Sequence, residues 1–318
     1  MTSDKNDSVV IYTSVDQVFS EPILKEFENK TGIKVKALYD VEASKTVGLV
    51  NKLLAEKKNP QADVFWNSEV SRTIQLMNQD IFAPYKSIHW DKYPKEAKNE
   101  NYYWTGFASR ARVLIYNTDL LSESELPKSM FELTQPEWKG RVSMAYPLFG
   151  TTATHISSLY ATIGKEATES YLKELHDNDV MIVDGNARTR DLVVEGVVPI
   201  AFTDTDDANV AIQQGKPVDT LYFDKEGIGT LLIPNTVSLV KNSPNSVAGK
   251  HLIDYLLSAK TEEMLAYGES AQMPLQSGVK KPEFIPDIAD ITAMNVDYEQ
   301  AATYIEESAE FSKKLFIR

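Results

Sequence analysis

The sequence alternates between short apolar runs and amphipathic segments, and this alternation restricts the chain to few folds. VVIYTS (9–14) predicts a strand, and segment 20–32 then repeats apolar residues at helical spacing up to Gly32, a residue type that commonly ends helices. Further strands are predicted over 33–40 and 62–66, each followed by a helix. This order predicts an α/β domain with a largely parallel sheet.

The same order returns over 112–230 and predicts a second α/β unit, which a chain of 318 residues is long enough to hold. Strands are predicted there at 112–120 and 138–147. After this unit the sequence predicts a strand at 231–240, one amphipathic helix over 249–266, and a proline-spaced tail that becomes helical.

The composition excludes several classes of protein. The net charge is −13 and is spread along the chain, which argues against a nucleic-acid binder and against binding to anionic lipid. The chain has no cysteine, so disulfides, thiol catalysis and cysteine-type zinc sites are excluded. No apolar stretch approaches the ~20 residues of a membrane span.

Small polar residues follow two of the predicted strands. In open α/β sheets, ligands bind beyond the carboxyl ends of the strands. TSVD (13–16) and NSE (67–69) occupy such positions. The candidate ligand-binding residues from these two segments are Thr13, Ser14, Asp16, Ser68 and Glu69.

The loop GTTATH (150–155) leads from glycine through hydroxyl side chains into a helix. Backbone N–H groups at a helix N-terminus favour an anion, and threonine hydroxyls can add donors. The alternative is a threonine N-cap with nothing bound, and the histidine has the alternative of an ordinary packed position. The candidate residues are Gly150, Thr151, Thr152, Ala153, Thr154 and His155.

Arginines occur near two other predicted strand ends. GNARTR (185–190) carries Asn186, Arg188 and Arg190 at a strand-to-helix turn, where arginine could bind a carboxylate or a phosphate. Arg110 and Arg112 flank the start of the 112–120 strand. At GNARTR the alternative is that one or both arginines lie on the solvated face of the helix. Arg110 and Arg112 could either reach a ligand cleft or pair with nearby acids.

FTDTDDANVA (202–211) ends an apolar strand on Asp204, Asp206 and Asp207. An acidic first turn stabilised by the helix dipole would explain one or two of these residues. Three carboxylates at the ligand-binding end of a strand call for something that offsets their repulsion, such as a metal ion, an ammonium group or sugar hydroxyls.

Taken in order, several segments resemble one family over nearly the whole chain: the periplasmic ferric-iron-type solute-binding proteins of ABC importers, which are two-lobed (type II) extracellular solute-binding proteins. These segments are VVIYTSVD, FENKTGIKVK, ADVFWNSE, RARVLIYNT, PEWKGRV, FGTTATH, GNARTRDLVVEG and LIPNTVSLV. The resemblance implies an α/β fold of two lobes, with a ligand cleft that closes about two crossing hinge strands near 106–117 and 231–240.

The resemblance also sets expectations for the lobes and for the cellular role. We expect an N-terminal lobe of 8–108 plus 235–280, a C-terminal lobe of 109–234 plus 281–318, and a disordered lead over 1–7. The protein is expected to be a monomer in the periplasm or at the cell surface, with its leader removed. It is expected to deliver a ligand to an ABC permease in the membrane and to catalyse no reaction.

The family resemblance does not by itself identify the ligand of this protein. Its adjacent iron-binding tyrosines fall on Asp206 and Asp207, a histidine ligand falls on Asp16, and an acidic ligand falls on Ser68 or Glu69. The anion site of the family matches GTTAT. We therefore expect a small molecule whose phosphate or phosphonate lies on that helix end, with amine or hydroxyl groups facing Asp206 and Asp207.

Three alternatives stay open. Ferric iron or another metal ion, with a synergistic anion, could be bound by Asp16, Glu69, Asp206 and Asp207. A metal-dependent phosphoesterase could use the same fold, although no nucleophile–base pair is recognisable. A protein that sequesters metal without transport is the third. No cofactor is expected apart from a metal ion with its anion, if the metal alternative holds.

Overall fold

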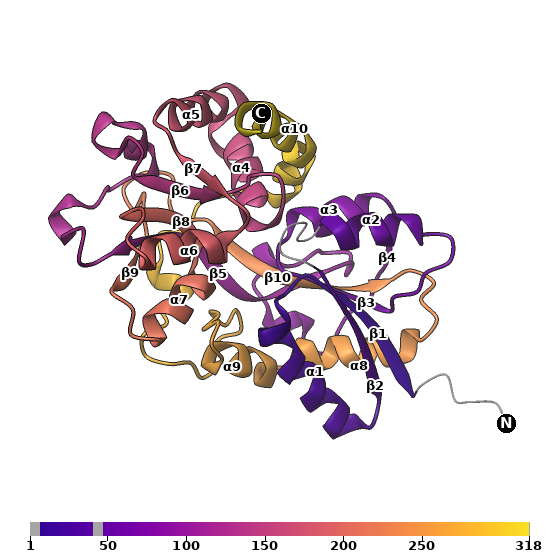
Figure 1. The fold of residues 1–318 in the computed structure, drawn as a ribbon. Coiled ribbons are helices and arrows are strands. Elements are labelled where there is room, and N and C mark those ends of the chain that lie inside the picture. The colour runs from indigo at the N-terminus through magenta and orange to yellow at the C-terminus, as the bar shows by residue number, and fades with distance from the viewer. Residues whose placement is uncertain (1–6, 41–46, 318) are drawn as a thin grey trace. The chain divides into compact units, whose positions relative to one another are not determined.

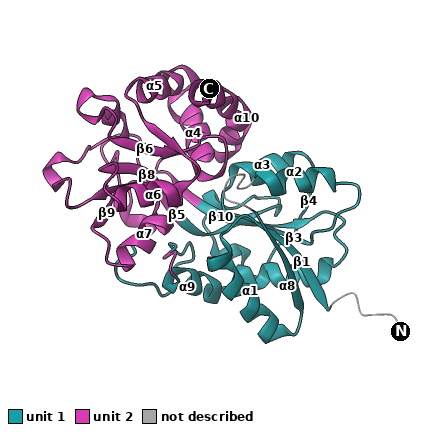
Figure 2. Cartoon of the chain, viewed as in Figure 1, with its two compact units in different colours: residues 1–109, 234–268, 272–285 teal, residues 110–233, 269–271, 286–318 magenta. Residues whose placement is uncertain are grey.

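The computed structural model describes residues 7–40 and 47–317. The expected disordered lead over 1–7 lies outside the described residues except for Asp7. The chain divides into two compact units (Figure 2). Unit 1 comprises residues 1–109, 234–268 and 272–285, and unit 2 comprises residues 110–233, 269–271 and 286–318.

Unit 1 is an α/β unit with helices on both faces of its sheet (Figure 1). Its sheet has the order β2-β1-β3-β10, in which β1 pairs in parallel with β2 and β3, while β10 (Leu232–Val240) pairs antiparallel with β3 and β4. Its elements are β1 (Ser8–Thr13), α1 (Gln17–Thr31), β2 (Lys34–Tyr39), α2 (Val47–Ala55), β3 (Val64–Asn67), α3 (Ser71–Asn78), β4 (Phe82–Ala83), η2 (Trp90–Lys92), η3 (Lys95–Ala97), α8 (Ser246–Leu256) and α9 (Ala259–Tyr267).

Unit 2 has the sheet order β5-β8-β6-β7, with β9 on β5. Strand β6 pairs in parallel with β7 and β8, whereas β5 pairs antiparallel with β8 and β9. Its elements are η4 (Glu123–Glu125), η5 (Met130–Thr134), η6 (Pro136–Trp138), β6 (Val142–Ala145), α4 (Gly150–Ile163), α5 (Lys165–Asp177), β7 (Met181–Val183), α6 (Asn186–Val194), β8 (Ile200–Asp204), α7 (Thr205–Gln213), β9 (Val218–Leu221), η7 (Ile288–Asp290) and α10 (Tyr298–Phe316).

Two strands carry the chain from one unit to the other. The unit boundary falls inside β5 (Thr105–Asn117), after Ser109, and inside β10 (Leu232–Val240), after Ile233. These are the crossing strands that the family resemblance implies.

Alternation along the strands explains why each sheet is covered on both faces. In β3, Val64 and Trp66 pack in the cluster that contains α1 and α8, while Phe65 packs in the cluster that contains α2 and α3. In β5, Leu114 packs with α4 and α5, and Ile115 packs with α6 and α7. Successive side chains of a strand point to opposite faces, so apolar runs of this kind bury both faces of a sheet.

Several local predictions are confirmed and others are wrong. Gly32 ends α1 with φ 76°, and its N–H donates to the carbonyl of Glu28 at 2.8 Å. The single helix expected over 249–266 is instead two helices, α8 and α9, because the Ser258 side chain accepts from the N–H of Thr261 and caps a new helix.

Two boundaries in unit 2 also differ from expectation. The strand expected over 138–147 is confined to Val142–Ala145, since Pro136–Trp138 form a 3₁₀ turn. The GTTAT segment is not a loop: α4 begins at Gly150, so Thr151 and Thr152 lie in its first turn.

The C-terminal segment joins unit 2 through a close backbone contact at Gly229. Thr230 N–H donates to the carbonyl of Thr292 at 2.8 Å, and Met294 N–H donates to that of Thr230 at 2.9 Å. Gly229 has φ 81°, and a Cβ placed there would lie 2.7 Å from the carbonyl carbon of Ala293. Only glycine allows this approach without a backbone shift.

We expect Gly229→Ala to destabilise unit 2 much more than Gly140→Ala does. Gly140 has φ 68°, and a Cβ at this position would meet nothing within 4 Å, so alanine there costs only the left-handed backbone strain, about 1–2 kcal/mol. Alanine at 229 adds a steric overlap of ~1–3 kcal/mol. Urea unfolding followed by circular dichroism measures both. Equal losses in the two variants would contradict the close contact.

Candidate functional site

Three helix N-termini in unit 2 follow the strands β6, β7 and β8. These strands run in the same direction, so the helices after them, α4, α6 and α7, begin at the same edge of the sheet. Their N-cap residues are Phe149, Gly185 and Asp204, and none makes a side-chain capping hydrogen bond. N–H groups in the first turn of a helix have no intrahelical acceptor, so this edge is rich in hydrogen-bond donors.

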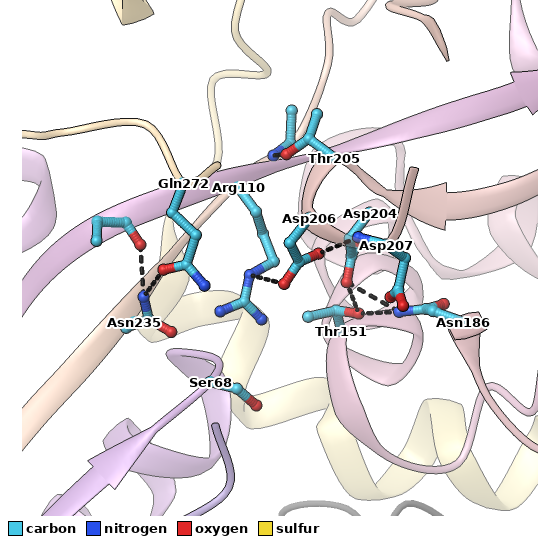
Figure 3. Close-up of polar contacts among 12 residues, drawn as sticks. Ser68, Arg110, Thr151, Asn186, Asp204, Thr205, Asp206, Asp207, Asn235 and Gln272 are labelled. Carbon is cyan, nitrogen blue, oxygen red and sulfur yellow. Dashed lines mark hydrogen bonds and ion pairs between the residues drawn. The ribbon is translucent and has the colours of Figure 1, made fainter. Parts of the chain in front are cut away.

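The three aspartates of FTDTDDANVA are each paired with an arginine of the same unit. Their carboxylate oxygens lie within 4.8 Å of one another. Asp204 and Asp206 are buried, and Asp207 is partly exposed. The N···O distances are 2.8 Å for Asp204–Arg112, 3.3 Å for Asp206–Arg110 (Figure 3) and 3.6 Å for Asp207–Arg190. The guanidinium groups therefore offset the repulsion among the carboxylates.

Asp204 is the acceptor at the centre of a buried hydrogen-bond network (Figure 3). Its Oδ2 accepts from the Thr151 hydroxyl at 2.5 Å and from Asn186 Nδ2 at 2.8 Å. Asn186 Nδ2 also donates to Thr151 Oγ1 at 2.9 Å, and Arg112 Nη1 donates to Asn186 Oδ1 at 3.1 Å. The Thr151 hydroxyl has one proton and gives it to Asp204, so this hydroxyl cannot also donate to a ligand.

The remaining donors at the start of α4 are Thr152 and the backbone. The hydroxyl of Thr152 makes one long contact, to Asn186 Oδ1 at 3.4 Å, and its residue is 2% exposed. Ala153 N–H already donates to the carbonyl of Phe149 at 3.3 Å. The helix therefore begins with the N–H groups of Gly150, Thr151 and Thr152 and no side-chain cap.

His155 lies in the core of unit 2 and is 3% exposed. Its ring centroid is 6.4 Å from that of Phe202 and 6.3 Å from that of Phe223, and its Nε2 has no hydrogen-bond partner among the described residues. Burial, with a smaller contribution from the positive charge of Arg112, lowers the pKa of His155 to about 3. The imidazole is therefore neutral at ordinary pH, and it packs as an apolar ring. Its neighbour Thr154 is fully buried.

The two arginines of GNARTR differ in position. The side chain of Arg188 is 49% exposed and pairs with Glu195 at 3.2 Å. Arg190 donates from Nε and Nη2 to Asp191 and also lies 3.6 Å from Asp207. Arg190 belongs to the aspartate cluster, whereas Arg188 lies on the surface of its helix.

Strand periodicity is the sequence signal that groups Arg112 with Arg110. Residues 110 and 112 are two apart in β5, so their side chains point to the same face. The antiparallel register sets Arg112 opposite Asp204 in β8. That register cannot be read from a single sequence, so the sequence identified both arginines without their partners.

The candidates of unit 1 form a separate polar cluster within that unit. Ser14 Oγ donates to Asn67 Oδ1 at 2.6 Å and accepts from the N–H of Ser68 at 2.8 Å. Thr13 Oγ1 accepts from the N–H of Val15. These contacts place TSVD and NSE side by side at the carboxyl ends of β1 and β3.

The carboxylate of Glu69 is already used within unit 1. It is fully buried and accepts from the N–H of Arg72 at 3.0 and 3.1 Å and from Asn67 Nδ2 at 3.0 Å, at the start of α3. Asp16, at the N-cap of α1, is partly buried. The four carboxylates of the metal alternative are thus divided, with Asp16 and Glu69 in unit 1 and Asp206 and Asp207 in unit 2.

Solved structures with the same fold are periplasmic binding proteins. Iron-bound HitA from Pseudomonas aeruginosa matches with a TM-score of 0.88 at 21% identity, covering 98% of this chain and 99% of that one. AfuA from Actinobacillus pleuropneumoniae, with fructose-6-phosphate bound, matches with a TM-score of 0.86 at 22% identity, covering 97% and 98%. These similarities establish the two-lobed type II fold.

The family model described as bacterial extracellular solute-binding protein matches residues 59–301. The chain belongs to this family. Its members are extracellular or periplasmic binding proteins that work with an ABC permease, and they are not enzymes, as the sequence predicted. No helix within the described ranges 7–40 and 47–317 is long and apolar enough to cross a membrane.

Curated relatives have names that refer to different ligands. Iron uptake protein A1 of Synechocystis is 26% identical over 290 residues, covering 87% of this chain and 78% of the relative. The Fe(3+)-binding periplasmic protein of Serratia marcescens is 24% identical over 301 residues, covering 93% and 87%. A Salmonella typhi protein named for 2-aminoethylphosphonate binding is 26% identical over 263 residues, covering 80% and 73%.

The burial of His155 predicts how the free energy of unfolding depends on pH. Its pKa in the folded state, about 3, is below the value of 6.5 in an unfolded chain. Between these pH values the unfolded chain binds the proton and the folded chain does not. The free energy of unfolding therefore falls as the pH falls through this window, by up to about 1.4 kcal/mol per pH unit.

We expect His155→Gln to remove this part of the pH dependence, with a shallower slope in urea unfolding measured from pH 7 to pH 4. His251→Gln is the matched control, because His251 is exposed. A slope in His155→Gln equal to that of the wild type would show that His155 titrates like an exposed histidine.

Proposed function

We propose that this solute-binding protein carries a small molecule with a phosphate or phosphonate group. The phosphate or phosphonate group lies at the N-terminus of α4, where it accepts from backbone N–H groups and from the Thr152 hydroxyl. Amine or hydroxyl groups of the same ligand face Asp206 and Asp207. The protein delivers this ligand to its ABC permease.

The observation that carries the proposal is the start of α4. The N-cap residue is Phe149, whose side chain has no acceptor and makes no capping hydrogen bond. A phosphate oxygen there would accept the hydrogen bonds that a Ser, Thr or Asp cap usually accepts. The helix dipole adds a partial positive charge at the same position.

The charge balance of the site also favours an anion. Arg112 and Arg110 offset the charges of Asp204 and Asp206, and Arg190 is shared between Asp207 and Asp191. The N-termini of α4, α6 and α7 add partial positive charge at the same edge of the sheet. A small anion meets a favourable potential there.

The ligands named for two similar proteins share this chemistry. AfuA is described with fructose-6-phosphate, and the Salmonella protein is named for 2-aminoethylphosphonate. Each compound joins a phosphorus-centred anion to hydroxyl or amine groups. Such groups could donate to Asp206 and Asp207, whose carboxylates can accept further hydrogen bonds beside their arginines.

Ferric iron with an anion is the second candidate. The close oxygens of Asp204, Asp206 and Asp207 favour it, as do the iron-related names of several relatives. Against it, positions 206 and 207 lack the tyrosines of the resembled iron binders. The arginines also occupy the same carboxylates, so a trivalent cation would lie beside three guanidinium groups, which repel it.

Native mass spectrometry of the purified protein tests the proposal directly. Spectra are recorded before and after mild unfolding, with metal analysis of the same sample. We expect an organic phosphate or phosphonate that is released on unfolding. Stoichiometric iron without an organic mass would overturn the proposal in favour of the metal candidate.

We also expect Thr152→Val to weaken the phosphate-bearing ligand by about 1–3 kcal/mol, because one hydrogen bond to a charged group is lost at constant shape. Isothermal titration calorimetry measures the change. Thr168→Val is the control: Thr168 is a buried threonine of α5 whose hydroxyl donates to the carbonyl of Gly164. An unchanged affinity in Thr152→Val would remove this hydroxyl from the anion site.

A further inference from the structure

Arg112 is the most completely buried charged side chain of the aspartate cluster. Its side chain is 0% exposed. Nη1 donates to Asp204 Oδ1 at 2.8 Å, and Nε and Nη2 have no partner among the residues that the structure describes. Burying a guanidinium is costly unless a charge compensates it, so this arginine requires Asp204.

Asp204 lies where its charge would hinder binding of an anion. It ends β8 at the N-cap of α7, and its Oδ2 is 2.5 Å from the hydroxyl oxygen of Thr151 in the first turn of α4. A phosphate on that turn would be a close neighbour of the carboxylate. In a buried site with low dielectric, an uncompensated negative charge at this distance repels the phosphate strongly.

Asp204 is nevertheless needed as an acceptor. It accepts from Thr151 and from Asn186, which lie in the first turns of α4 and α6. A neutral acceptor would not hold Arg112, and an aspartate without Arg112 would repel the ligand. Arg112 also donates to Asn186 Oδ1, so it orients the side chain amide that contacts Thr151.

We infer that Arg112 is a positioning residue for the anion site. It neutralises Asp204, and Asp204 can then orient Thr151 and Asn186 without repelling a phosphate on α4. The inferred action of Arg112 is through Asp204, and a direct contact between Arg112 and the anion is what the test must distinguish from it. This inference rests on the proposed function, because it takes the ligand bound at the start of α4 to be an anion.

A double-mutant cycle on the full chain tests this inference. Arg112→Met, Asp204→Asn and the double variant are stripped of ligand by unfolding and refolding. They are titrated by calorimetry with fructose 6-phosphate, 2-aminoethylphosphonate and inorganic phosphate. Arg141→Met is the control, because it removes the same charge from an exposed position in unit 2.

Arg112→Met alone should weaken binding about tenfold or more, because Asp204 is left as an unpaired negative charge beside the anion. Asp204→Asn keeps an acceptor for Thr151 and leaves no negative charge beside the anion, but Arg112 loses its compensating charge, so binding should weaken less than in Arg112→Met. The double variant should recover binding to within about threefold of the wild type, because neither charge remains. Arg141→Met should leave the affinity unchanged.

Other outcomes overturn the inference. If the double variant binds no better than Arg112→Met, Arg112 contacts the anion itself or only supports the fold. If Asp204→Asn weakens binding as much as Arg112→Met does, the loss in Arg112→Met does not come from an unpaired Asp204. If the wild type binds none of the three probes, the proposed function fails and the inference fails with it.

If Arg112→Met does not fold, a conservative substitution at the same position is measured in its place. Thermal melts followed by circular dichroism identify such a case in Arg112→Met. Arg112→Lys then replaces it: the charge is kept, so the affinity should stay within about threefold of the wild type. A loss of tenfold or more in a folded Arg112→Lys protein would show that the guanidinium fork matters beyond its charge, which contradicts the inference.

Discussion

The antiparallel pairing of β5 with β8 is the constraint on which the site of unit 2 depends. Its register sets Arg112 opposite Asp204, so a charge that could not be buried alone is buried with its partner. Asp204 then orients Thr151 and Asn186, which lie in the first turns of two of the helices that start at this edge of the sheet. This strand pairing therefore fixes the side chains around the start of α4.

The two polar clusters of the protein differ in how the start of the adjacent helix is capped. In unit 1, the Glu69 carboxylate and the Asn67 amide bond to neighbours at the start of α3, and Ser14 bonds to Asn67. In unit 2, the first turn of α4 has no side-chain cap, although the side chains around it are paired. A helix start without a cap, beside acids that are already compensated, is better suited to an anion than to a cation.

Much of this architecture could be predicted from the sequence, because it follows from periodicity. Short apolar runs predicted β1, β3 and β8, and Gly32 predicted the end of α1. The Ser258 cap that divides α8 from α9 was missed, because the apolar pattern continues through it. The acids and arginines of unit 2 were found as residue types. Their pairing was not, since it depends on strand register and on contacts between residues about 90 positions apart.

The crossing of the chain in β5 and β10 has a consequence for how the protein folds. Unit 1 needs residues 234–268 in addition to its first 109, and β10 pairs with both β3 and β4. Until β10 has been synthesised, β3 has an unpaired edge and the apolar cluster around Val237 and Leu252 is incomplete. Unit 1 therefore cannot be complete until the chain has been synthesised beyond most of unit 2.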